Sequence, residues 1–142
     1  MKPFQLKGFK FQNKGIAKVL GELEAEVMED IWKQKISTVR EICDQLCRTR
    51  KKGISFNTVM TIMNRLVQKG LLEKQRGVNY YEYKPRLTKE KFLDNISNNI
   101  MKGLMKDFKP YVLAHFIENL DSDDLDELMK LREKLSKEKL SL

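Results

Sequence analysis

Residues 55–70 read SFNTVMTIMNRLVQKG, and this is the most informative stretch of the 142-residue chain. Ser55 is a favourable helix N-cap, and Gly70 suits the end of a helix. With about 100° between successive residues, the apolar side chains fall on one side of the helix: Val59, Ile62, Met63, Leu66 and Val67. The polar side chains fall on the opposite side: Asn57, Thr58, Thr61, Asn64, Arg65 and Gln68. The stretch therefore predicts a helix with one buried face and one hydrogen-bonding face.

The hydrogen-bonding face of this helix carries no acidic residue. A solvated surface helix usually mixes Glu with Lys at i,i+4 spacing. Thr, Asn, Arg and Gln are instead compact or forked hydrogen-bonding groups that suit base edges and phosphates. The pattern favours contact with nucleic acid over a face that meets only water.

The charge of the chain is distributed unevenly. The formal net charge is +8, and it divides into +9 over residues 1–86 and −1 over residues 87–142. A basic surface of this kind favours a polyanionic partner. A lysine-rich coat that only aids solubility is the alternative, and charge alone does not separate the two.

Two helices are predicted ahead of residue 55. Over residues 22–34, Leu23, Val27 and Ile31 recur at four-residue spacing and predict an apolar stripe. The acidic residues are assigned to the other face of that helix: Glu22, Glu24, Glu26, Glu29 and Asp30. Residues 38–41, TVRE, form a capping box and predict a helix over 39–48. The residues that this second helix should bury are Val39, Ile42, Cys43 and Leu46.

A β-hairpin is predicted directly after Gly70. Residues 71–76 and 80–84 form its strands, residues 77–79 its turn, and Pro85 ends it. Three helices followed by a hairpin is the order of a winged helix-turn-helix. The residues that this wing could place at phosphates or in the minor groove are Lys74, Arg76 and Asn79. A hairpin that only closes the domain is the alternative, and the cationic tip favours contact.

Three more helices are predicted over residues 88–142. One runs from the Thr88 cap to about Asp107, the next begins near Pro110, and the last is capped by Asp121 or Ser122. None is long enough to bury its apolar stripe unaided, so the helices pack on one another or on a second chain. Short recognition helices usually act in pairs, which favours a dimer. The expected dimer contacts are Phe92, Ile96, Ile100, Leu104, Phe108, Phe116 and Leu128.

The predicted fold class is mainly α with a small β-hairpin wing. Residues 1–19 are expected to be a basic flexible arm, 20–86 a winged helix-turn-helix domain, and 87–142 a helical dimerisation region. No stretch approaches the roughly 18 apolar residues of a membrane-spanning helix. Lysines also interrupt any signal-peptide core near the N-terminus. These features predict a cytoplasmic protein.

Enzyme chemistry has little support in the sequence. His115 is the only histidine and lies in an apolar run, where a structural role is the more common one. Phosphate-binding loops and nucleophile elbows are missing from the sequence. We therefore expect no enzyme activity, no cofactor and no metal site. Cys43 and Cys47 lie at i,i+4 on one helix face and leave three interpretations open: a metal site shared between chains, a redox switch, or inert thiols.

Three segments resemble the penicillinase-repressor family of winged-helix transcriptional repressors (the BlaI, MecI and CopY type). They are LGELEAEVM at 20–28 with Ile31-Trp32, TVREI at 38–42, and NTVMTIMNRL at 57–66 with Lys69-Gly70. The similarity covers about residues 20–135. It implies a homodimer that binds double-stranded operator DNA with dyad symmetry, with the C-terminal helices as the interface.

The resemblance also implies roles for individual residues. It implies that Asn57, Thr58, Thr61 and Arg65 are the DNA-contacting positions of the recognition helix, and that Ser55 meets a phosphate at the helix N-terminus. In the beta-lactam branch, a sensor-protease pathway cuts an Asn-Phe bond in the first C-terminal helix. Asn99-Ile100 stands at that position here, with isoleucine in place of phenylalanine. The copper branch carries a C-terminal cysteine cluster, whereas this sequence has no cysteine beyond Cys47.

Taken together, these features predict a sequence-specific repressor that blocks promoter DNA as a homodimer. The regulated genes are expected to form a resistance or stress-response operon. Two alternatives stay open: a helical protein-interaction adaptor with a basic face, and a DNA-binding protein without sequence preference.

Overall fold

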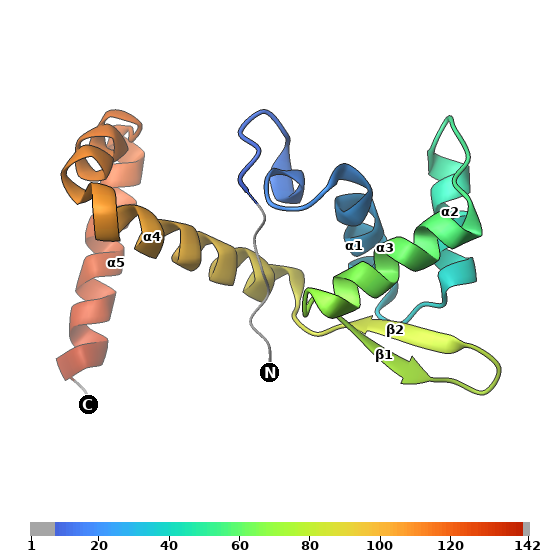
Figure 1. The fold of residues 1–142 in the computed structure, drawn as a ribbon. Helices are drawn as coiled ribbons and strands as arrows, with labels where there is room; N and C mark the ends of the chain where they lie inside the picture. Colours follow the sequence, from blue (N-terminus) through green and yellow to red (C-terminus); the bar gives the residue numbers. More distant parts are fainter. Residues whose placement is uncertain (1–7, 141–142) are drawn as a thin grey trace. The chain divides into compact units, whose positions relative to one another are not determined.

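The computed structural model describes residues 8–140 and divides into two compact units, Met1–Asn95 and Ile96–Leu142. Its elements are η1 (Gly15–Lys18), α1 (Glu22–Gln34), α2 (Val39–Thr49), α3 (Phe56–Gln68), β1 (Leu72–Arg76), β2 (Tyr81–Pro85), α4 (Lys89–Glu118) and α5 (Ser122–Leu140) (Figure 1). This architecture confirms the predicted class, which was mainly helical with a two-stranded antiparallel hairpin.

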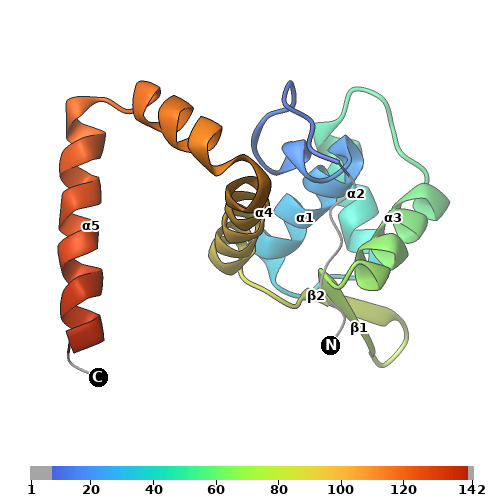
Figure 2. The same ribbon diagram turned by 60° about the vertical axis from the view of Figure 1, so that its left-hand side comes forward.

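The core of the first unit lies where α1, α2 and α3 pack against one another (Figure 2). Each helix contributes most of the apolar stripe that its sequence predicts, although Leu23 and Val67 are only half-buried. The core side chains from the three helices include Val27, Met28, Ile31, Ile42, Leu46, Val59, Met63 and Leu66. Burying apolar surface of this kind is the main favourable term in folding, so this unit has a hydrophobic core of its own.

Local contacts fix where α2 begins, and local contacts together with a glycine fix where α3 begins and ends. Thr38 and Glu41 form the predicted capping box, in which the Glu41 amide donates to Thr38 Oγ1 at 3.2 Å. Ser55 Oγ accepts from the Thr58 amide at 3.1 Å. Gly70 has a φ of 84°, a left-handed conformation that glycine adopts without steric cost. The predicted boundaries of the third helix are thereby confirmed.

The hairpin is held in place through its second strand. β1 and β2 pair from Leu72↔Pro85 to Arg76↔Tyr81. Tyr83 exchanges two backbone hydrogen bonds with Ser37, at 2.8 and 3.0 Å, so β2 is tied to the segment between α1 and α2. At the turn, a Cβ on Gly77 would lie 2.6 Å from the carbonyl oxygen of Tyr80, which makes glycine necessary there.

Two expectations for the first unit were wrong in part. Ile16 and Val19 are buried and η1 contacts α1, so residues 15–19 are packed and are not a flexible arm. Residues 1–7 of the expected arm lie outside the described residues. The unit also extends past the expected boundary at 86, because Phe92 is fully buried and its ring lies 5.4 Å from that of Trp32.

The second unit consists of the rest of α4 and α5. The helical backbone conformation of α4 breaks at Phe108, with φ −125° and ψ 21°, two positions ahead of Pro110, where the sequence predicts a new helix. Asp121 caps α5 by accepting from the Asp124 amide at 2.8 Å. From residue 97 to residue 138, no described side chain is buried. Among residues 8–140, none of the helices combines the length and the hydropathy that a membrane span requires.

Candidate nucleic-acid interface

The outward face of α3 presents hydrogen-bonding groups and no carboxylate. Its exposed polar side chains are Asn57, Thr58, Thr61, Arg65 and Gln68. The opposite face fills the core, so the helix cannot rotate without exposing Val59 and Leu66. The packing of the first unit therefore holds these polar groups in one row on its surface.

Local hydrogen bonds orient the hydroxyl groups of this row. Thr61 Oγ1 donates to the carbonyl oxygen of Asn57 at 2.9 Å. Its remaining lone pairs can accept from a base amino group, and its methyl can contact that of a thymine. Ser55 Oγ lies 2.7 Å from Thr58 Oγ1 and also caps the helix. The start of α3 thus offers hydroxyls and a helix N-terminus, where anions are favoured.

A buried carboxylate supports the last part of this face. Glu24 was assigned to the solvent side of α1, and that prediction was wrong: its side chain is only 8% exposed. It accepts from Lys69 Nζ at 2.6 Å and lies 3.8 Å from Arg65 Nη1. Buried charges need partners, and these two come from the C-terminal end of α3, Arg65 from its last turn and Lys69 from its C-cap. The pairing joins α1 to α3 while the Arg65 side chain stays 54% exposed.

The wing is bound to α3 through Asn64. Asn64 Oδ1 accepts from the Tyr83 hydroxyl at 2.9 Å and from Lys74 Nζ at 3.4 Å. The Lys74 ammonium also lies 4.2 Å from the centre of the Tyr81 ring, a cation–π distance. Asn64, predicted as a DNA contact, therefore has its carbonyl oxygen committed to holding the hairpin. Arg76 and Asn79 are exposed near the hairpin turn, as the sequence predicts for a wing.

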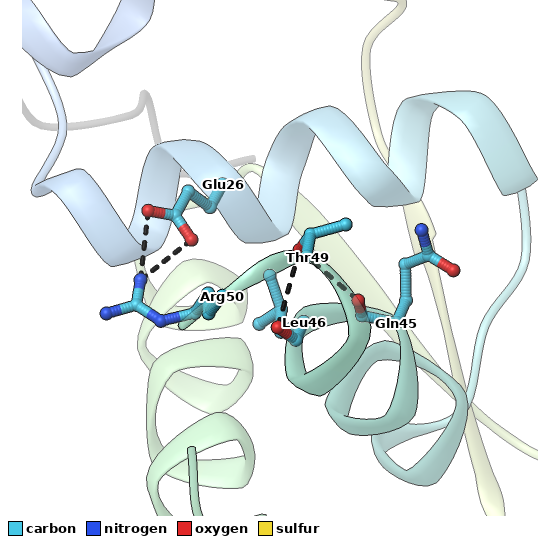
Figure 3. Close-up of polar contacts among 5 residues, drawn as sticks. All are labelled: Glu26, Gln45, Leu46, Thr49 and Arg50. Atoms are coloured by element: carbon cyan, nitrogen blue, oxygen red, sulfur yellow. Dashed lines mark hydrogen bonds and ion pairs between the residues drawn. The ribbon is translucent and has the colours of Figure 1, made fainter. Parts of the chain in front are cut away.

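The segment between α2 and α3 begins at Arg50, whose side chain is held by α1. Arg50 Nη1 donates to both carboxylate oxygens of Glu26, at 2.9 and 2.8 Å, which ties the end of α2 to α1 (Figure 3). Thr49 Oγ1 lies 3.3 Å from the carbonyl oxygens of Gln45 and Leu46. Lys51 and Lys52 follow and are exposed. This basic connection lies in sequence directly ahead of the α3 N-terminus.

The residues predicted to form a dimer interface divide into two groups. Phe92 packs in the core of the first unit and Ile96 is 6% exposed, so these two are not available to a second chain, and their assignment was wrong. Ile100 is half-buried. The other predicted contacts are 38–54% exposed: Leu104, Phe108, Phe116 and Leu128. The Asn99–Ile100 bond lies inside α4 with Asn99 exposed, and its cleavage stays a prediction.

Sequence reasoning missed Glu24 and Tyr83 as supports of this surface. Their partners lie 45 and 19 residues away in the chain, so no local spacing reveals them. The strand alternation did place Tyr83 on the returning strand, but its hydroxyl contact depends on how the hairpin meets α3. These contacts depend on the tertiary structure.

The family model for the penicillinase repressor matches residues 20–134. The chain belongs to the penicillinase repressor family. It is 27% identical over 121 residues to the transcriptional regulator BlaI of Mycobacterium tuberculosis, covering 78% of this chain and 80% of the relative. It is 24% identical over 116 residues to the penicillinase repressor of Bacillus licheniformis, covering 80% and 89%. A solution structure of the DNA binding domain of the repressor BlaI is 28% identical, with a TM-score of 0.44, over 54% of this chain and 90% of that one.

Proposed function

We propose that this member of the penicillinase repressor family is a sequence-specific DNA-binding repressor. The observation that carries the proposal is the exposed, carboxylate-free face of α3, held in place by its own buried face. Such a helix fits the major groove, where each base pair presents its own donors and acceptors. The curated relatives are described as a transcriptional regulator and a penicillinase repressor, which agrees with this role.

The proposed base contacts are Asn57, Thr58, Thr61 and Arg65 on α3. Lys74, Arg76 and Asn79 of the wing, and Ser55 at the helix N-terminus, would contact the phosphate backbone or the adjacent minor groove. Backbone contacts position a protein on DNA, whereas base contacts specify the sequence. The two groups are therefore expected to respond differently to mutation.

The repressor is proposed to act as a homodimer on a dyad operator. In the second unit, large apolar side chains on α4 and α5 are exposed in the single chain, among them Leu104, Phe116 and Leu128. Contiguous exposed apolar side chains mark interaction surfaces, and a second copy of the chain would cover them. Two recognition helices would then enter major grooves about 34–36 Å apart. The regulated genes are proposed to form a resistance or stress-response operon.

A competition experiment tests the proposal. The full chain is titrated onto a duplex from its own upstream region, with excess unrelated duplex as competitor. Retention of the upstream duplex supports sequence-specific binding. Equal loss to any duplex would indicate binding without sequence preference, and no binding to either would favour a protein-interaction adaptor.

Substitutions of Arg65 separate base reading from simple charge. Arg65→Ala should weaken binding to the natural site by about 1–3 kcal/mol if the guanidinium pairs with a guanine. Arg65→Lys is the matched variant, because lysine keeps the charge but lacks the planar fork. If Arg65→Lys binds the natural site as tightly as the original chain, Arg65 contributes only charge. Circular dichroism of both variants checks that the contact with Glu24 is not needed for folding.

A further inference from the structure

The two cysteines of the chain meet at a single backbone oxygen. Cys43 Sγ lies 3.6 Å and Cys47 Sγ 3.5 Å from the carbonyl oxygen of Ile54. Residues four apart on a helix lie on the same face, and here both thiols point toward the segment that leads into α3. Each is a weak donor to that oxygen. The pair is therefore a preformed dithiol, because both thiols contact one oxygen and Cys47 is also a side-chain hydrogen-bond neighbour of Cys43.

The two thiols differ in their access to solvent. Cys43 is buried and Cys47 is exposed. Burial, followed by the nearby Cys47 thiol, raises the pKa of Cys43 above its usual value. Cys43 is accordingly a protonated donor at neutral pH. A reagent would reach the pair through Cys47 and then meet Cys43 at once.

The surroundings of the pair limit what it can bind. Among the residues that the structure describes, no three His, Cys, Asp or Glu side chains are grouped for a metal ion. Structural zinc sites use four such ligands, so the pair alone does not make one. Soft sulfur ligands suit soft, thiophilic centres. A trivalent arsenical with one organic group has two remaining positions for sulfur ligands. The angle between those positions is bent, so the two sulfurs must lie close together.

We propose that Cys43 and Cys47 form a two-thiolate site for a monosubstituted trivalent arsenical, coupled to the start of α3. In the reaction, R–As(OH)₂ exchanges its two hydroxyls for the two sulfurs. Two As–O bonds and two S–H bonds break, and two As–S bonds and two O–H bonds form, because each thiol proton joins a departing hydroxyl and leaves as water. Nothing is oxidised or reduced.

Binding would act on the segment that begins α3. Once both sulfurs bind arsenic, neither carries a proton to donate, so the Ile54 carbonyl loses both contacts. Ile54 directly precedes Ser55, the N-cap of α3. The expected consequence is weaker binding to operator DNA. This consequence rests on the proposed function, whereas the binding site itself does not.

Mass spectrometry of the intact reduced chain with phenylarsine oxide tests the site. Because the sequence holds only two cysteines, any sulfur adduct must involve this pair. We expect one arsenical per chain, loss of both titratable thiols, and reversal by a dithiol but not by a monothiol at equal thiol concentration. Cys47→Ser should lose the stable adduct, and because Cys47 is exposed this variant should keep the fold. Cys43→Ser should lose it as well.

Several outcomes would overturn the site. They are an adduct that persists in Cys47→Ser, one arsenical that joins two chains, or the absence of an adduct in the unmodified chain. The DNA measurement is made separately on loaded and unloaded protein. Equal operator affinity in both would overturn the coupling to α3. If the unloaded protein binds no operator DNA, the proposed function is wrong. Mass spectrometry still tests the arsenical site in that case.

Discussion

The two compact units of this chain differ in how far their apolar side chains are buried. In Met1–Asn95, the side chains of Val27, Ile31 and Leu66 are completely buried. In Ile96–Leu142, Leu104 and Phe116 keep about two fifths of their surface exposed. Burying apolar area is worth roughly 25 cal/mol per Å², so the first unit has this stabilisation within one chain. The second has an apolar surface that a second copy is proposed to complete.

The largest expected effect comes from the core of the first unit. Leu66→Ala should lower the free energy of unfolding by about 2–5 kcal/mol, because it removes buried methyl groups and leaves a cavity. Urea unfolding followed by circular dichroism measures the change. Gln68→Ala, at an exposed position on the same helix, is the control and should change it by no more than about 0.5 kcal/mol. Equal effects of the two substitutions would mean that the two faces of α3 do not differ in their contribution to stability.

A substitution in the second unit should change assembly instead. Leu128→Asp should weaken dimer formation by at least about 1.5–3 kcal/mol, the value of burying one leucine. Sedimentation at several protein concentrations measures the monomer–dimer equilibrium. Glu127→Gln, at the neighbouring exposed position, is the control. A Leu128→Asp chain that sediments like the original would mean that α5 takes no part in an interface.

The helix caps of the two units form a matched pair. Thr38→Ala removes the capping box of α2 and should cost about 0.5–2 kcal/mol of unfolding free energy. Asp121→Ala removes the corresponding bond at the start of α5. It should weaken the dimer by a similar amount and leave the unfolding of the first unit unchanged. Thermal unfolding at two protein concentrations separates them, since only the second effect should depend on concentration.

The smallest expected effect concerns the contact between the wing and the DNA backbone. Lys74→Ala should remove one phosphate contact from each wing and weaken binding to all sequences alike. Each lost contact should flatten the dependence of log K on log salt by about 0.9. The change should be about twice as large for the dimer as for the Leu128→Asp monomer. Binding at several salt concentrations provides the measurement, and an unchanged slope would place Lys74 away from the phosphates.

Much of the first unit could be predicted from local sequence. The spacing of Leu23, Val27 and Ile31, the capping box at Thr38 and the glycine at 70 each act within a few residues. Helix boundaries depend on just such short-range hydrogen bonds and on the side-chain period. These features therefore appear in the structure close to where the sequence predicts them.

The contacts that support the site could not be predicted in the same way. Phe92 carries the same apolar period as Leu104, yet it lies in the core against Trp32 while Leu104 stays exposed. Glu24 resembles the other acidic residues of α1 until Lys69 is brought to it. Periodicity shows that a side chain faces an apolar or polar neighbour, but it does not identify the neighbour.

Sequence patterns alone are enough to predict the helices, the hairpin, the acid-free face of α3 and membership of the penicillinase repressor family, because each of these depends on residues that are close together in the chain. The folded structure was needed to identify the carboxylate that supports Arg65 and Lys69, the contact that holds the wing to Asn64, and the Ile54 oxygen that the two thiols share. Such contacts join residues that are distant in the chain or that are brought together by the packing of neighbouring segments. The energies of these contacts depend on burial and on interatomic distances, and both are set only when the chain folds.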